Sequence, residues 1–142
     1  AGEDCHAAVE TMRGHTLGRA LYHGSPLPNT NIPGLIGGFA GERVLRAPCD
    51  GIFTAVHRIG DTVEEGETIG FVEGQPMKCT ISGVLRGVLD DGVPVKKGMK
   101  SGDVDPRCKP EYCTTISDKA LAVGGGVVEA LLYLSAKAQG RR

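Results

Sequence analysis

The sequence predicts a mainly β protein in which one short unit occurs twice. Of its 142 residues, 22 are glycine, whereas a typical share of about 7% would give about ten. This excess favours tight turns and short strands over long helices. A shift of 32 residues aligns positions 51–72 with 83–104, and seven of the 22 aligned positions are identical, four of them glycine. An internal duplication therefore organises the centre of the chain.

Each copy is predicted to contain short strands joined by tight turns. In the first copy, residues 51–56 form a strand, residues 59–63 a turn with a short strand, and residues 69–72 a further strand with apolar residues at every second position. The second copy repeats the pattern, with the turns at Asp91-Gly92, Lys97-Gly98 and Ser101-Gly102. A unit of this size cannot bury its apolar face alone, so we expect the two copies to pack on each other.

The turn pattern also suggests a fold. Gly60-Asp61-x-Val63-x-x-Gly66 resembles the hammerhead motif of biotinyl and lipoyl domains. That resemblance implies a barrel-sandwich hybrid, a duplicated hammerhead, over residues 47–105. Pro76-Met77-Lys78-Cys79 resembles the modified segment of biotin carriers, but the copies are symmetric about Gly74-Gln75, which places Lys78 away from the hairpin tip. We therefore expect no covalent biotin or lipoate, and a carrier function ranks last.

The flanks of the repeat are predicted to complete one structural domain with it. Residues 1–46 form an N-terminal β flank that packs on the core, with two short strands within 8–22, a loop at 24–38 and a strand at 42–46. Residues 106–142 form an irregular stretch and a C-terminal helical segment with Ser117 as N-cap. Gly124-Gly125-Gly126 leaves open whether this segment is one helix or two pieces.

Composition narrows the classes of partner. The net charge is −1, from 16 basic and 17 acidic residues, and Trp is absent; both facts disfavour nucleic acid and anionic membranes as partners. The longest apolar run, 127–134, is interrupted by Glu129 and falls short of the roughly 20 residues that span a bilayer. With no signal peptide apparent, we expect a soluble cytoplasmic protein. The five cysteines, an odd number, do not indicate a disulfide framework.

Motifs in both flanks resemble one family. They are Glu10-Thr11-x-Arg13-Gly14-His15-x-Leu17-Gly18-Arg19, Pro28-Asn29-Thr30, Pro33-Gly34-x-Ile36-Gly37-Gly38, Asp103-Val104-Asp105-Pro106-Arg107, Tyr112-Cys113, Ile116-Ser117-Asp118-Lys119-Ala120 and Gly124-Gly125-Gly126-Val127. Together they resemble the YqeB family of selenium-dependent molybdenum hydroxylase system proteins. Members are about twice as long as this chain and carry a nucleotide-fold-like N-terminal half. The resemblance implies that this chain, as a fragment or a processed product, corresponds to the C-terminal portion.

The resemblance implies a role and a ligand class. We expect an accessory or maturation factor for these hydroxylases, which handles selenium or docks the hydroxylase or other maturation proteins. A selenium species or the molybdenum cofactor is the ligand implied. A non-catalytic scaffold, including a homo-oligomer formed through glycine-rich surfaces and the C-terminal segment, is the alternative. Whether the chain is an enzyme stays open.

Three groups of residues are candidates for chemistry. Cys113 occupies a family position, and a thiolate there could carry selenium or sulfur; the alternative is a buried structural cysteine. Arg107 and Lys119 are candidate ligands of a small anion, in a candidate binding group with Asp105 and Asp118. Structural ion pairing among these residues and Asp103 is the preferred explanation of the group. The third group is His6, Glu10 and His15, which could form a metal or acid–base cluster if the fold brought them together.

Overall fold

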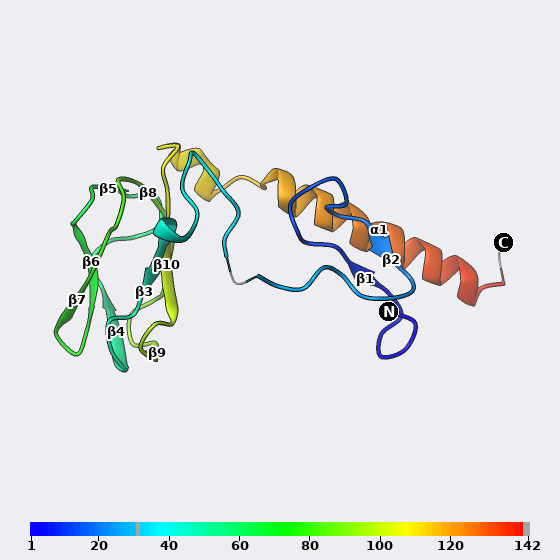
Figure 1. Cartoon of the computed structure of the whole chain (residues 1–142), viewed down its shortest axis with the longest axis horizontal. Coiled ribbons are helices and arrows are strands. Elements are labelled where there is room, and N and C mark those ends of the chain that lie inside the picture. Colours follow the sequence, from blue (N-terminus) through cyan, green and yellow to red (C-terminus); the bar gives the residue numbers. More distant parts are fainter. Residues whose placement is uncertain (31, 141–142) are drawn as a thin grey trace. The chain divides into compact units, whose positions relative to one another are not determined.

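The computed structural model describes residues 1–30 and 32–140, and the chain consists of two compact units (Figure 1). The helical unit comprises Ala1–Asn31 and Ile116–Arg142, and the β unit comprises Ile32–Thr115. These boundaries differ from the predicted divisions at residues 46 and 105, because residues 32–46 and 106–115 belong with the repeat. Residue 31 of the predicted loop and residues 141–142 of the predicted helical segment lie outside the described residues.

The β unit contains two four-stranded antiparallel sheets. Their strands are β3 Val44–Arg46, β4 Gly51–Ala55, β5 Thr62–Val63, β6 Thr68–Val72, β7 Gln75–Lys78, β8 Gly83–Val88, β9 Pro94–Val95 and β10 Lys100–Asp105. One sheet has the order β3-β10-β8-β5 and the other β7-β6-β4-β9. With the two-stranded sheet of the helical unit, the chain is mainly β. The hydrogen bonding of the described strands gives separate sheets and no closed barrel.

The two copies of the repeat have the same strand register. Subtracting or adding 32 converts β8 into β4, β9 into β5 and β10 into β6. It also converts the pairing of β5 with β8 into that of β9 with β4: Thr62↔Val84 and Val63↔Gly83 become Pro94↔Ile52 and Val95↔Gly51. The repeat seen in the sequence is therefore a repeat of hydrogen bonds as well as of side chains.

Each copy also exchanges its first strand with the other copy. β3 precedes the first copy and pairs with β10, the last strand of the second copy. β7 precedes β8 and pairs with β6, the last strand of the first copy. Both pairings shift register at the same relative place, between Lys100 and Gly102 and between Thr68 and Gly70. Neither copy can therefore complete its hydrogen bonding without the other.

The core lies between the two sheets and is built from equivalent positions. Ten of its buried residues form five pairs related by 32: Leu45 and Met77, Ala47 and Cys79, Phe53 and Leu85, Val63 and Val95, and Val72 and Val104. Phe53 and Leu85 are both fully buried. Each copy thus supplies half of one apolar core, which explains why the apolar alternation recurs in both.

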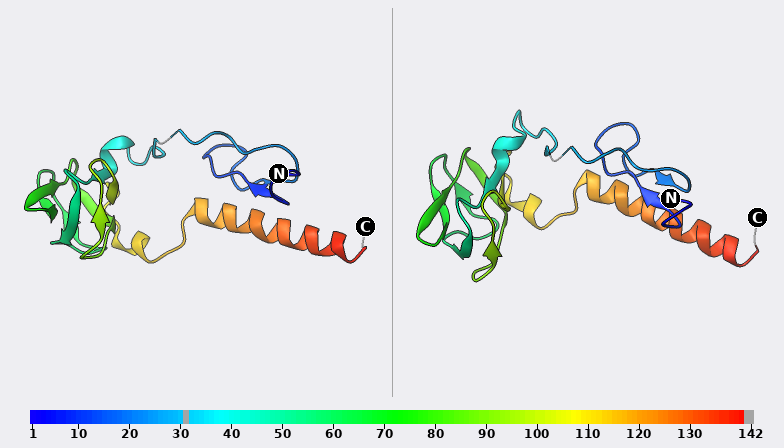
Figure 2. Two further views of the ribbon diagram at one scale, coloured as in Figure 1. Left: turned by 90° about the horizontal axis from the view of Figure 1, so that it is seen from below. Right: turned by 60° about the horizontal axis from the view of Figure 1, so that its bottom comes forward.

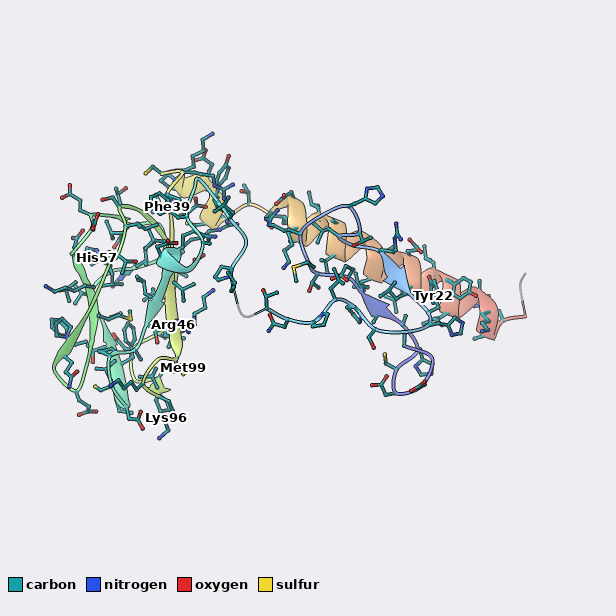
Figure 3. All side chains as sticks on the ribbon, viewed as in Figure 1. Tyr22, Phe39, Arg46, His57, Lys96 and Met99 are labelled. Carbon is teal, nitrogen blue, oxygen red and sulfur yellow. The ribbon has the colours of Figure 1, made fainter. Side chains whose placement is uncertain are left out.

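The helical unit packs a short hairpin on one helix. β1 (Ala8–Val9) pairs with β2 (Ala20–Leu21), and α1 runs from Asp118 to Ala138; Figure 2 shows the hairpin beside α1 in both views. Ser117 caps α1 by accepting the Ala120 N–H at 3.2 Å, as predicted, and the glycine triplet lies inside a single helix. Tyr22 adds a ring contact with Tyr133 of α1 at 4.3 Å between centroids (Figure 3).

Two glycines set the distance between hairpin and helix. A Cβ on Gly126 would lie 2.0 Å from the Gly18 carbonyl oxygen, and one on Gly18 would lie 2.4 Å from the Ala122 carbonyl oxygen. Gly18 also has a positive φ of 82°, which disfavours any side chain there. The third glycine of the triplet is therefore required by this packing.

One helix in the described part of the chain is long and apolar enough to cross a membrane when judged only by length and composition. The stretch is Pro110–Ala138, and 11% of its most apolar window is buried. Core helices of soluble proteins share this length and composition, and the longest apolar run within the stretch, residues 127–134, still contains Glu129.

The exchange of first strands predicts that the β unit cannot be divided. If the chain is cut between Glu73 and Gly74, the fragments 1–73 and 74–142 should each lack β structure, because each holds half of the core and unpaired strand edges. Mixing them should restore it, as measured by amide dispersion in NMR spectra and by far-UV circular dichroism. Cooperative folding of either fragment alone would contradict the exchange.

Candidate functional site

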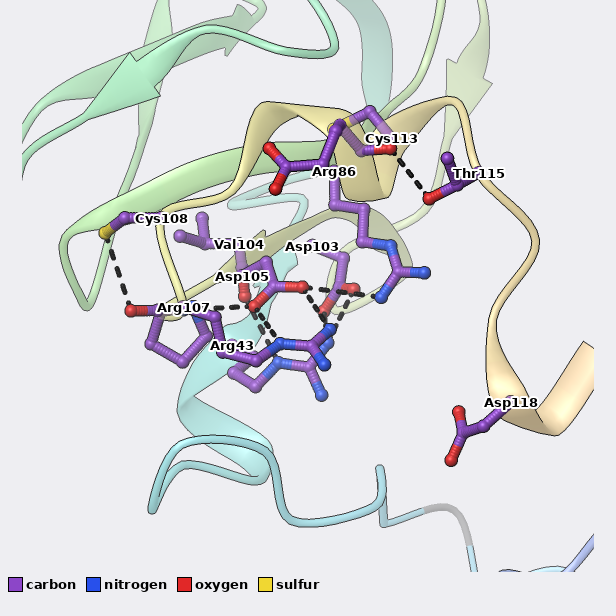
Figure 4. Close-up of polar contacts among 12 residues, drawn as sticks. Arg43, Arg86, Asp103, Val104, Asp105, Arg107, Cys108, Cys113, Thr115 and Asp118 are labelled. Carbon is purple, nitrogen blue, oxygen red and sulfur yellow. Dashed lines mark hydrogen bonds and ion pairs between the residues drawn. The ribbon is translucent and has the colours of Figure 1, made fainter.

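Charged side chains gather at the end of β10 (Figure 4). Asp105 is 1% exposed, and its carboxylate accepts hydrogen bonds from Arg107 Nε at 2.9 Å and Nη2 at 2.6 Å, and from Arg86 Nη1 at 3.4 Å. The two N–H···O bonds to Arg107 have the bidentate geometry of strong charge-assisted pairs. The hydrogen bonds and positive charge of Arg107, with the charge of Arg86, hold the pKa of Asp105 below its usual value.

A second ion pair lies beside the first. Arg43 Nη2 donates to both carboxylate oxygens of Asp103, at 2.8 and 3.1 Å. The rest of this buried guanidinium donates to the carbonyl oxygens of Val104 and Gly34, at 3.2 and 3.3 Å. With the Asp105 pairs, three arginines and two aspartates make up a network of net charge +1.

The network fixes the segment that carries Cys113. Arg107 stacks on the ring of Tyr112 at 4.4 Å, and Tyr112 and Cys113 lie in the 3₁₀ helix η2 (Pro110–Cys113). The Cys113 thiol is partly buried and lies 3.8 Å from the carbonyl oxygen of Leu85 in β8. Cys113 is therefore held against the residue that precedes Arg86.

A groove of about 380 Å³ opens on the same sheet. Its walls are residues 86–88 of β8 with the following Leu89, and residues 100–103 of β10. Arg86 and Lys100 are the two cations in this wall, and Asp103 is its one carboxylate. The groove therefore suits a small anion better than a cation.

The sequence prediction grouped residues that belong to different units. Asp105, Arg107 and Cys113 lie in the β unit, but Asp118 and Lys119 lie in the helical unit. Asp118 there pairs with Arg13 at 2.7 Å, and the charge of Lys119 helps to lower the pKa of Glu10. Asp118 and Lys119 therefore interact within the helical unit. Their closeness to Arg107 in the sequence does not bring them to the β unit.

The predicted cluster of His6, Glu10 and His15 is not formed. Glu10 is buried, and its carboxylate accepts the N–H groups of Leu27 at 2.8 Å and Met12 at 2.7 Å. These hydrogen bonds are the main cause of its lowered pKa. Within residues 1–30 and 32–140, no three His, Cys, Asp or Glu side chains are placed to hold a metal ion. The Glu10 carboxylate therefore links two loops through backbone N–H groups, and it does not act together with the histidines.

His57 shows how the copies diverge. Its Nδ1 lies 3.4 Å from Asp61 and its Nε2 lies 3.1 Å from Glu67. The equivalent residues of the second copy are Leu89, Val93 and Met99. One copy therefore joins its turns by polar contacts where the other has apolar side chains.

Two site residues, Arg43 and Arg86, were missed in the sequence. Comparing the copies supplies the signal: Arg86 and Asp103 stand where the first copy has Thr54 and Phe71. Charged residues at two positions where the other copy is uncharged mark a local role: Arg86 pairs with Asp105, and Asp103 pairs with Arg43.

Comparison with known proteins identifies the family. The chain is 47% identical over 134 residues to the uncharacterized protein YqeB of Escherichia coli (strain K12), an alignment that covers 94% of this chain. The chain belongs to the YqeB family. It spans 25% of that relative's length, so the relative is about four times as long as this chain; the expected factor of two was wrong.

Other comparisons add little. No family model matches the chain. A crystal structure of an aspartoacylase family protein from Mesorhizobium loti is similar over 44% of this chain and 22% of its own, with a TM-score of 0.40 and 17% identity. A likeness at that level carries no argument about function or fold.

The Asp105 network predicts a matched pair of stability effects. Asp105→Asn should lower the free energy of unfolding by about 3 kcal/mol, because it leaves the guanidinium groups of Arg86 and Arg107 without their buried carboxylate. Asp50→Asn, which removes an exposed ion pair with Lys96, is the control and should cost much less. Urea unfolding measures both, and equal losses would contradict the network's role.

The contribution of Asp105 to the free energy of unfolding should depend on pH. Because the pKa of Asp105 is lowered in the folded state, its contribution is fully present above the ordinary aspartate pKa and is lost as pH falls through the folded value. The stability of the natural chain should therefore fall more steeply in acid than that of Asp105→Asn.

Thiol reactivity provides a further prediction. Burial, with Glu67 nearby, raises the pKa of Cys79 to about 11, so roughly 0.1% of it is thiolate at pH 8. Iodoacetamide at that pH should modify exposed Cys5 and Cys108 first and reach Cys79 only after unfolding, as followed by peptide mass spectrometry. Labelling of native Cys79 as fast as Cys108 would refute this.

Proposed function

We propose that this chain is an accessory module in the maturation of selenium-dependent molybdenum hydroxylases, and that its β unit is a barrel-sandwich hybrid of the biotinyl and lipoyl kind. The fold proposal is supported by the duplicated register and by the exchange of β3 and β7 between the copies. The functional proposal is supported by family membership and by the position of Cys113 beside a network of net positive charge.

The module uses this fold as a scaffold and not as a lysine carrier. The tip of the β6–β7 hairpin consists of Glu73 and Gly74, which have φ angles of 48° and 77°, as a tight hairpin turn requires. Lys78 is the last residue of β7 and lies opposite Thr68. A lysine in this place does not protrude on a turn, so a modifying ligase would not reach it as it reaches a carrier lysine.

Cys113 is the group through which the module handles selenium. A selenopersulfide R–S–SeH on a selenium-carrying protein is the donor. The Cys113 thiolate attacks selenium, a new S–Se bond forms at Cys113, the original S–Se bond breaks, and R–S⁻ leaves with the bonding pair. No net oxidation occurs, because selenium keeps its oxidation state as it passes from one thiol sulfur to the other.

A non-catalytic scaffold is the second candidate. It is favoured by the observation that both aspartates of the network already pair with arginines of the same chain. In the part of the chain that the structure describes, no buried side-chain polar atom lacks a partner. Such a network is fully explained as the fastening that holds residues 106–115 on β8 and β10.

The experiment compares Cys113→Ser with Cys108→Ser, which removes an exposed thiol five residues earlier. Each variant chain is incubated with a small-molecule selenopersulfide made from selenide and a thiol disulfide, and intact mass is measured. Peptide analysis should find selenium at Cys113 in the natural chain and in Cys108→Ser, in addition to any selenium on exposed Cys5. Cys113→Ser should carry one selenium atom fewer than the natural chain by intact mass.

Hydroxylase maturation in cells separates the two candidates. Loss of hydroxylase activity with Cys113→Ser, at unchanged abundance of the protein, supports selenium handling. Normal maturation with Cys113→Ser rejects the chemical role. If Asp105→Asn then abolishes maturation, docking through the fastened segment is the function that stands.

A further inference from the structure

One face of α1 is apolar, uncharged and uncovered. Its large side chains are 56% to 68% exposed. They recur from Leu121 to Leu132, about 17 Å of helix, at spacings of three, four and seven residues that keep them on one side. We call this the α1 outer face: Leu121, Gly124, Gly125, Val128, Leu131, Leu132 and Ser135. An exposed apolar surface of this length on one helix marks an interaction site.

The opposite side of α1 is already occupied by the hairpin. Gly126 and Ala130 are buried there, with Gly126 against Gly18. Charged residues of α1 also contact the hairpin segment: Asp118 pairs with Arg13, and Glu129 accepts a hydrogen bond from the Tyr22 hydroxyl. The outer face therefore remains available while the unit is folded.

Two glycines of the outer face have no close neighbour among the described residues. A Cβ on Gly124 or Gly125 would meet nothing within 4 Å, in contrast to Gly126. Glycine inside a helix costs about 1 kcal/mol relative to alanine. Packing against the hairpin explains Gly126 alone, so the notches at Gly124 and Gly125 need another explanation.

We propose that a second copy of this chain covers the α1 outer face, with the two helices antiparallel and their twofold axis at Val128. In this arrangement residue i lies opposite residue 256 − i of the partner copy. Leu132 then lies opposite Gly124, Leu131 opposite Gly125, and Leu121 opposite Ser135. Apart from the central layer, where Val128 meets its own copy, each layer joins one large and one small side chain, so the leucines of each copy fill the glycine notches of the other.

A parallel pair does not have this complementarity. It would place leucine against leucine and glycine against glycine at the same level, which overpacks some layers and leaves voids in others. Opposed helix dipoles also favour the antiparallel arrangement.

A lipid bilayer fits the outer face less well than a second copy does. If α1 spanned a membrane, the charged side chains of Glu129, Lys119 and Glu10, which lies between β1 and β2, would enter hydrocarbon. Burying charges there raises the free energy. If the unit lay on a membrane, cationic side chains should border the apolar face, whereas no lysine or arginine of α1 lies between Leu121 and Ser135. The inference is independent of the chemistry proposed for Cys113.

Oligomeric state provides the first test. The full chain should be a dimer by size-exclusion light scattering across a dilution series, and Leu132→Lys should make it a monomer. Leu35→Lys is the matched control, because Leu35 is equally exposed, at 71% against 68%, but lies outside the helix; it should leave the dimer intact. Gly124→Leu with Gly125→Leu fills both notches and should also give a monomer, with helicity retained in circular dichroism.

Disulfide crosslinking tests the orientation, in a background in which exposed Cys5 and Cys108 are serine. Val128→Cys should crosslink to its own copy under mild oxidation, and Leu121→Cys with Ser135→Cys should also crosslink. Leu121→Cys alone should not, because antiparallel copies separate the two sulfurs by about 20 Å. Efficient crosslinking of that single variant would show a parallel pair and overturn the arrangement.

Two further outcomes would overturn the proposal. One is a monomer at every concentration, and the other is a dimer that survives both Leu132→Lys and the double glycine substitution. Cosedimentation of the natural chain, but not of Leu132→Lys, with phosphatidylcholine–phosphatidylglycerol vesicles, without any dimer in solution, would assign the outer face to a membrane instead.

Discussion

The exchange of first strands between the two copies is the constraint on which the β unit depends. β3 completes the sheet of the second copy and β7 that of the first, so each copy is left with an unpaired strand edge when the other is removed. The exchange also brings Phe53 and Leu85 into one core. Because the chain enters through β3 and leaves through β10, which are hydrogen-bonded neighbours, the flanking segments 32–43 and 106–115 begin side by side on one sheet.

That shared starting point explains the location of the charged network. Arg43 precedes β3, whereas Asp103, Asp105 and Arg107 lie at the end of β10, and Arg86 lies on the neighbouring β8. The ion pairs hold both flanking segments on the sheet. These segments lie outside the duplication, so they have no counterpart in the other copy. Cys113 is held against β8 as a consequence, since η2 follows directly from the fastened turn. The chemistry proposed for Cys113 and the structural role of the ion pairs are therefore compatible within residues 106–115.

The helical unit depends on close approach rather than on exchange. Gly18 and Gly126 bring hairpin and helix backbones together, and Glu10 ties the loops around them through backbone donors. This packing covers only one side of α1, so a helix with apolar residues on most of its surface keeps a bare outer face. The same segment has the length and composition of a membrane span, because a helix that packs on a protein partner can share both properties with one that faces lipid.

The sequence alone determined the duplication, the short strands around its glycine turns, the N-cap at Ser117 and the family, because these depend on local spacing and on residue identity. It also placed Lys78 away from the hairpin tip. Tertiary structure decided which strands pair across the copies, and so which residues meet. Lys119 and Asp118 stand close to Arg107 in sequence but belong to the helical unit, Arg43 joins Asp103 across about 60 residues, and Glu10 is claimed by backbone N–H groups instead of joining the histidines. Contacts between residues far apart in the sequence depend on which strands pair. Local residue spacing does not show that pairing.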